Sequence, residues 1–190
     1  PPHNPGGGPK PSAVEAERVP AKLTELDTLP LELMGFNIFS GSQTLRPQSI
    51  IEAHSKTFKL AYRLAESPPS PVRWLNIGGG LGIPYFPGEQ HLELAPIAEN
   101  LAPLLEQARK RLPEAEIVME LGRYLTAEAG IYVCQILDKK ASRGEIFLVA
   151  NGGLHHHLAV SGNFGQVIRK NYPVCFGNRV TGEETEVVSV

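Results

Sequence analysis

The chain has 190 residues, of which 42% are hydrophobic and 20% are charged, as is typical of a globular protein. Its formal net charge of -2 offers no surface that would attract a polyanion, so we expect no nucleic-acid partner. No apolar run approaches the ~20 residues that cross a bilayer, so we expect no membrane partner. Cys134 and Cys175 have no CxxC spacing and are expected to be thiols in a reducing cytoplasm.

The first part of the chain alternates between helix and strand patterns. After a Pro- and Gly-rich opening, residues 14–29 carry apolar side chains at helical spacing, and Pro20 suits the first turn of that helix. A short apolar run over residues 33–39 predicts a buried strand. Residues 47–66 predict a second helix, which the Pro-rich stretch at 67–71 ends.

The alternation continues with a strand over residues 72–77, closed by the glycine run at 78–82. A helix over residues 94–112 and a strand over 116–120 follow. Strands separated by helices are typical of parallel βα units. In such folds, ligands bind at the loops that follow the carboxyl ends of the strands.

The pattern changes after Gly130. Residues 131–137 and 145–149 predict two strands with only a short Lys/Ser/Arg/Gly turn between them, which is hairpin spacing. We therefore predict an α/β domain over residues 1–130 and the beginning of an antiparallel β domain over residues 131–190.

Polar or glycine-rich residues follow each of the first three predicted strands. The glycine run at 78–82 favours a phosphate, because glycine N–H groups can approach an anion closely, although a tight turn without a ligand would use the same residues. Ser40 and Ser42 fit either phosphate donors or a helix N-cap. Glu120 and Arg123 could pair with each other. Alternatively, Glu120 could face a protonated ring nitrogen and Arg123 a phosphate or a substrate carboxylate.

Together these strand ends resemble the motifs of the fold-type III pyridoxal-phosphate (PLP) decarboxylases, which include the ornithine, diaminopimelate and arginine decarboxylases. The motifs of that family read roughly H-x-G-S-Q, G-G-G-x and E-P-G-R. In this chain they read Phe39-Ser40-Gly41-Ser42-Gln43, Gly78-Gly79-Gly80-Leu81 and Glu120-Leu121-Gly122-Arg123.

The resemblance implies an α/β fold in which residues 1–130 form the later part of a PLP-binding (β/α)8 barrel of the TIM type. Residues 131–190 would then begin the antiparallel β domain. It also implies a cytoplasmic, homodimeric carboxy-lyase that acts on a small-molecule amino acid.

The resemblance further implies roles for single residues. Ser42 and the N–H groups of Gly78, Gly79 and Gly80 would bind the PLP phosphate. Glu120, the catalytic candidate, would pair with the ring nitrogen, because a protonated ring accepts the electrons of decarboxylation better. The remaining candidates are Phe39 against the ring, and Gly122 and Arg123 at the phosphate or the substrate.

Several departures from the family pattern qualify the resemblance. None of the eight lysines stands on an early barrel strand, where the family holds PLP covalently, and Lys10 fits a surface loop better. Cys175 does not match the family's cysteine–acid motif. We therefore expect a central piece of a longer enzyme that cannot hold PLP covalently by itself. Phe39 replaces a histidine and Asn151 replaces an aspartate, so the substrate is expected to be unusual or carrier-bound.

Two other functions remain open. One is a PLP-binding carrier or regulatory protein without turnover, and the other is an amino-acid racemase, which Glu120 disfavours because related racemases place an arginine near the ring nitrogen. Residues His155, His156 and His157 invite a metal, but alternate side chains of a strand point to opposite faces, so we expect no metal.

Overall fold

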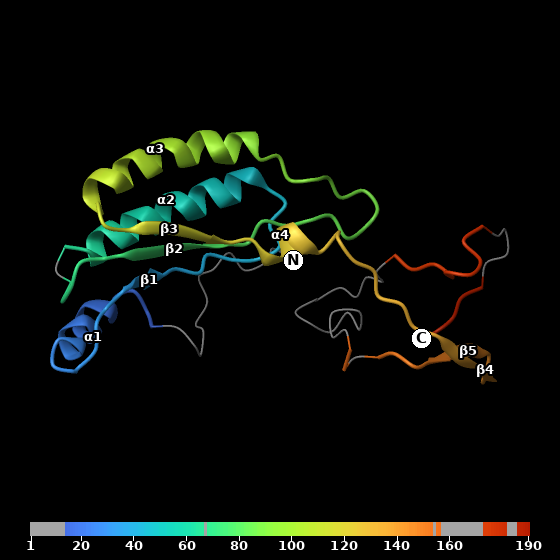
Figure 1. Ribbon diagram of the computed structural model, residues 1–190. Coiled ribbons are helices and arrows are strands. Elements are labelled where there is room, and N and C mark those ends of the chain that lie inside the picture. The colour runs from blue at the N-terminus through green and yellow to red at the C-terminus, as the bar shows by residue number, and fades with distance from the viewer. Residues whose placement is uncertain (1–13, 67, 154, 157–172, 182–185) are drawn as a thin grey trace. The chain divides into compact units, whose positions relative to one another are not determined.

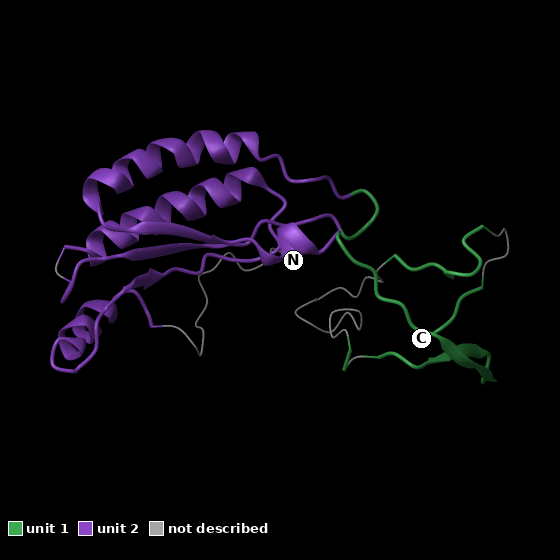
Figure 2. Ribbon diagram, in the orientation of Figure 1, with its two compact units in different colours: residues 1, 85–88, 129–190 green, residues 2–84, 89–128 purple. Residues whose placement is uncertain are grey.

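A computed structural model describes residues 14–66, 68–153, 155–156, 173–181 and 186–190. The described residues form two compact units, shown in different colours in Figure 2. One unit holds the residues between 14 and 84 and between 89 and 128. The other holds residues 85–88 and the residues from 129 onward. No helix in these described ranges is long and apolar enough to cross a membrane.

The first unit is built on a parallel sheet in the order β1-β2-β3. The strands are β1 (Gly35–Asn37), β2 (Trp74–Gly79) and β3 (Glu116–Glu120). The connections between them are the long helices α2 (Pro47–Leu64) and α3 (Ala95–Arg111), which lie on the same face of the sheet in Figure 1. The predicted strand–helix–strand–helix–strand order is confirmed.

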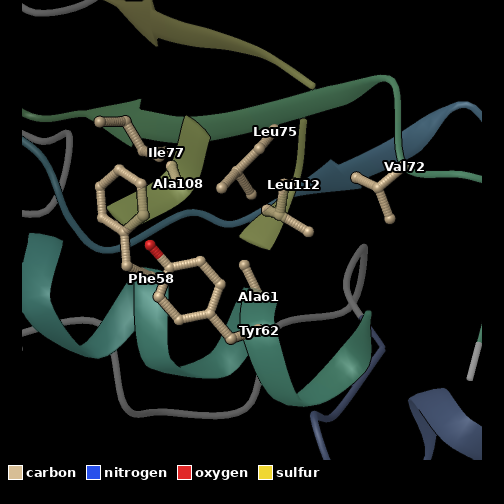
Figure 3. Close-up of a cluster of buried hydrophobic side chains, with 8 residues drawn as sticks. All are labelled: Phe58, Ala61, Tyr62, Val72, Leu75, Ile77, Ala108 and Leu112. Atoms are coloured by element: carbon tan, nitrogen blue, oxygen red, sulfur yellow. The ribbon is translucent and has the colours of Figure 1, made fainter. Parts of the chain in front are cut away.

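The core of this unit lies between the sheet and the two long helices. Phe58 of α2 and Leu75 of β2 are both fully buried, and Ala108 of α3 is 1% exposed. Figure 3 shows the aromatic rings of Phe58 and Tyr62 facing the apolar side chains of β2. Alternate residues of β2 point to opposite faces, so Leu75 and Ile77 enter this core while Trp74 and Asn76 lie on the other face.

Two shorter helices complete the unit. Helix α1 (Val19–Leu26) is shorter than the predicted 14–29, and Pro20 does lie in its first turn, where its missing N–H costs no hydrogen bond. Helix α4 (Gly122–Thr126) follows β3 directly.

Strand β2 continues to Gly79, so the first two glycines of the run belong to the strand and not to the turn after it.

The second unit contains the antiparallel hairpin of β4 (Ile136–Ser142) and β5 (Glu145–Ala150). The predicted hairpin exists, but the prediction of a strand over 131–137 is wrong. Arg143 and Gly144 have φ values of 53° and 84°, which makes a tight two-residue turn and moves the first strand toward the C-terminus.

Candidate active site

The loops that follow the three parallel strands meet at the carboxyl edge of the sheet and enclose a cavity of about 210 Å³. The residues that line it are Phe39, Gly41, Ser42, Gln43, Gly79, Gly80, Leu81, Glu120, Leu121 and Arg123. Residues from all three predicted motifs therefore line one cavity. A larger hollow of about 350 Å³ lies between α2 and α3 and contains no residue of these motifs.

The glycine run lets the three loops pack closely. Gly78 and Gly80 have φ values of 75° and 85°, a conformation that side-chain-bearing residues rarely adopt. A Cβ on Gly80 would lie 2.6 Å from the carbonyl oxygen of Gly41, and a Cβ on Gly79 would overlap the carbonyl of Glu120. These close approaches give Gly79 and Gly80 a role in packing, and phosphate binding by the glycine run stays a prediction.

Gln43 joins the loop after β1 to the other two loops. Its Nε2 donates to the Ile83 carbonyl at 2.5 Å, and its Oε1 accepts the Ile83 N–H at 3.3 Å. The same Oε1 accepts from Arg123 Nη1 at 3.2 Å. Gln43 has a left-handed φ of 53°, and the next residue, Thr44, bonds through its backbone to Gly80 and Gly82. These contacts fix the position of Arg123 relative to the glycine loop.

Asn76 makes the second connection across the site. Its Nδ2 donates to Glu120 Oε1 at 2.7 Å, and its Oδ1 accepts the N–H of Gly78 at 2.8 Å. The Gly78 N–H is thus used within the protein, and Gly78 does not line the cavity. Of the three glycine N–H groups expected at a phosphate, those of Gly79 and Gly80 belong to residues at the cavity wall.

The other predicted residues of the first unit have varied surroundings. Ser42 is exposed and lines the cavity, whereas the Ser40 hydroxyl shares a hydrogen bond of 3.0 Å with Thr57 of α2. Phe39 lines the cavity and is 50% exposed. Gly122 begins α4 and is not among the lining residues.

The second unit holds Asn151, whose Oδ1 accepts the N–H of Gln135 at 2.8 Å. His155 and His156 lie in a turn with ring centroids 3.9 Å apart, so the predicted separation of these two side chains on opposite faces of a strand is wrong. His157 and Lys10 fall outside the described residues. Cys134 and Cys175 are free thiols, as predicted, and both are exposed.

Comparison with protein families gives a match over residues 12–127 to the family described as pyridoxal-dependent decarboxylase, pyridoxal binding domain. This chain belongs to that family. The match covers β1, β2 and β3 and all three motifs, so the resemblance read from the motifs and the PLP cofactor that it implied are both confirmed.

Two curated relatives are named as decarboxylases. The L-glutamyl-[BtrI acyl-carrier protein] decarboxylase of Niallia circulans is 34% identical over 89% of this chain and 40% of its own length. The diaminopimelate decarboxylase of Thermoplasma acidophilum is 36% identical over 55% of this chain and 25% of its own length. The chain therefore spans well under half of the length of these relatives.

Solved structures give the same fold. The diaminopimelate decarboxylase of Helicobacter pylori, complexed with L-lysine, is 28% identical with a TM-score of 0.57. The aligned region covers 76% of this chain and 34% of that one. The predicted fold class, part of a barrel of βα units followed by antiparallel β structure, is confirmed.

The sequence interpretation gave no role to Gln43 or Asn76, which connect the parts of the site. Gln43 is the last residue of the first motif, so the sequence located it near the site but could not predict its hydrogen bonds. Asn76 had a weaker signal, as the one polar residue among the apolar residues of the strand Trp74–Ile77. Gln43 bonds Ile83, 40 positions along the sequence, and Asn76 bonds Glu120, 44 positions along, and periodicity gives no information at such separations.

Proposed function

We propose that the full-length protein containing this chain is a PLP-dependent amino-acid decarboxylase, a carboxy-lyase, with its site at the cavity described above. The observation that carries the proposal is the composition of the cavity wall. Glu120 supplies a carboxylate, and Ser42, Gly79, Gly80 and Arg123 supply hydroxyl, N–H and guanidinium donors. A carboxylate together with several anion donors suits a ligand with a basic ring nitrogen and a phosphate.

The proposed roles follow from the chemistry of each group. Glu120 accepts a hydrogen bond from the protonated ring nitrogen and so stabilises the positive charge there. Bound PLP supplies an electron-withdrawing ring, which takes up the electron pair that remains when CO₂ departs. Ser42 and the N–H groups of Gly79 and Gly80 bind the phosphate, and Phe39 packs its ring against the cofactor.

Arg123 has a role at either the phosphate or the substrate carboxylate. Its guanidinium presents donors in a planar fork that suits both anions. Its bond to Gln43 keeps one edge of that fork at the wall of the cavity. A guanidinium held in place by this bond loses less side-chain entropy on binding an anion than an unrestrained arginine would.

For the substrate, we propose an unusual amino acid, with a carrier-bound amino acid as the leading class. Support comes from the relative of Niallia circulans, whose name specifies a carrier-bound glutamyl substrate and which matches 89% of this chain. Asn151 also supports it, because an aspartate would suit the distal ammonium of a diamino acid better than a neutral amide does.

The proposed protein is a cytoplasmic homodimer. The two exposed free thiols agree with a reducing compartment. Residues 1–130 would be the later part of the PLP-binding barrel, and residues 131–190 the beginning of the β domain. We propose the compartment, the dimer and these two domains for the full-length enzyme that contains this chain.

The test is CO₂ release by the full-length protein with PLP, measured on free amino acids and on the same amino acids linked to an acyl carrier protein. We expect PLP-dependent release of one CO₂ per substrate molecule, with the higher kcat/KM for a carrier-linked amino acid. Racemised product without CO₂ would identify a racemase instead. PLP binding with neither product would identify a carrier or regulatory protein.

A further inference from the structure

Strand β2 contains an irregularity next to the site. Asn76 is opposite Val118 of β3, and regular pairing would place Gly78 opposite Glu120. Instead Gly79 is opposite Glu120, so β2 contains one extra residue between the two pairs. Such a bulge changes the direction of nearby side chains, and bulges are frequent beside active sites.

The amide of Asn76 spans this bulge. Its Oδ1 accepts the N–H of Gly78, two residues along the chain, where the backbone has its left-handed φ of 75°. A backbone N–H is only a donor, so this bond fixes which end of the amide faces Gly78. The opposite end, Nδ2, therefore faces Glu120 and donates to its Oε1 at 2.7 Å.

An asparagine side chain can both accept the Gly78 N–H and donate to Glu120 in this space. An aspartate could still accept from Gly78, but it would put a second carboxylate against Glu120, which repels it. A leucine of similar shape could make neither bond. In the described part of the chain Oε2 of Glu120 accepts no hydrogen bond, so it stays available to a further donor.

We propose that Asn76 is a positioning residue for decarboxylation, which holds the Glu120 carboxylate in place through Oε1 and leaves Oε2 for the ring nitrogen. Because the same amide also accepts the Gly78 N–H, it couples the Glu120 carboxylate of β3 to the bulge in β2. This inference rests on the proposed function, and it concerns a residue outside the three motifs named in the sequence analysis.

The first experiment compares Asn76→Asp with Asn37→Asp in the full-length enzyme. Asn37 of β1 is the matched control, since it is exposed, lies opposite Asn76 in the sheet and makes no bond to Glu120. We expect Asn76→Asp to lower kcat by about tenfold or more, the effect of losing a bond to a charged group. KM should change less than threefold, and Asn37→Asp should stay within twofold of the wild type. A similar kcat for both variants would overturn the proposal.

The second experiment needs neither cofactor nor substrate. The folding equilibrium of the apo protein is measured by urea denaturation for Asn76→Asp, Glu120→Gln and the double variant. In the double variant the side chain at position 120 donates the hydrogen bond and the carboxylate at position 76 accepts it, so the pair is restored with its direction reversed. We expect Asn76→Asp to lower the folding equilibrium constant. The double variant should have a folding equilibrium constant about tenfold or more above that of Asn76→Asp. If Asn76→Asp does not fold, the double variant should.

A double variant no more stable than Asn76→Asp would refute the positioning role. Failure of the proposed function would look different, since the wild-type enzyme would then release no CO₂ while the apo-protein cycle could still show the coupling.

Discussion

His54 of α2 is 2% exposed, and neither of its ring nitrogens has a hydrogen-bond partner within the described residues. Burial lowers the pKa of this histidine from the usual 6.5, because the charged form loses its hydration. A buried polar group without a partner costs about 1–3 kcal/mol. Replacing it by leucine, which has a similar volume and no polar atom, should therefore raise the free energy of unfolding by about that amount at pH 8.

The effect should grow as the pH falls. Below pH 6.5 the unfolded chain binds a proton at residue 54 and the folded protein does not, so the wild type loses stability. The loss approaches about 1.4 kcal/mol for each pH unit until the lowered pKa of the folded state is reached. The His54→Leu variant lacks this dependence, so its advantage over the wild type should widen between pH 7 and pH 5.

Urea denaturation of the full-length protein at pH 8, 7, 6 and 5 measures both effects. His91→Leu is the control, because His91 is exposed and its replacement should change stability by less than about 0.5 kcal/mol at every pH. If His54→Leu were less stable than the wild type, or if its advantage were the same at all four pH values, the assignment of an unpartnered, neutral histidine would be wrong.

Two further predictions concern the core and the site. Phe58→Ala removes a fully buried ring between α2 and the sheet and should cost about 3–5 kcal/mol in urea denaturation, and a loss below about 1 kcal/mol would contradict this packing. Gln43→Ala removes three hydrogen bonds of about 0.5–1.5 kcal/mol each, so the Kd for PLP should rise about tenfold or more in fluorescence titrations. The exposed Gln48→Ala is its control, and equal Kd values for the two variants would refute the bridging role of Gln43.

The sequence predicted the parallel α/β unit well because its helices are long and strongly periodic. Helices α2 and α3 begin within one residue of their predicted starts, since Pro47 and Pro96 favour the first turn of a helix. The hairpin was predicted less well. The apolar run at 131–137 suggested a strand, but the Arg143–Gly144 turn set the register instead.

The sequence likewise identified some residues of the site and missed others. Its motif residues could be found because each stands at the end of an apolar strand. The roles of Asn76 and Gln43 could not be predicted, because they depend on a bulge in β2 and on loops that meet only in the folded chain. The glycine run fitted either a phosphate site or a tight turn in the sequence, and only the distances to Glu120 and Gly41 revealed the packing role of Gly79 and Gly80.

The central claim is that Glu120 serves the cofactor ring in a decarboxylase, and the most direct test is the rate of PLP-dependent CO₂ release by full-length Glu120→Gln. Glutamine preserves the size of the side chain and can still accept from Asn76, but it cannot offset the charge of a protonated ring. We predict a fall in kcat of more than about tenfold, which corresponds to roughly 1.4 kcal/mol in the barrier, with a smaller change in the Kd for PLP. A variant that releases CO₂ at the wild-type rate would contradict it.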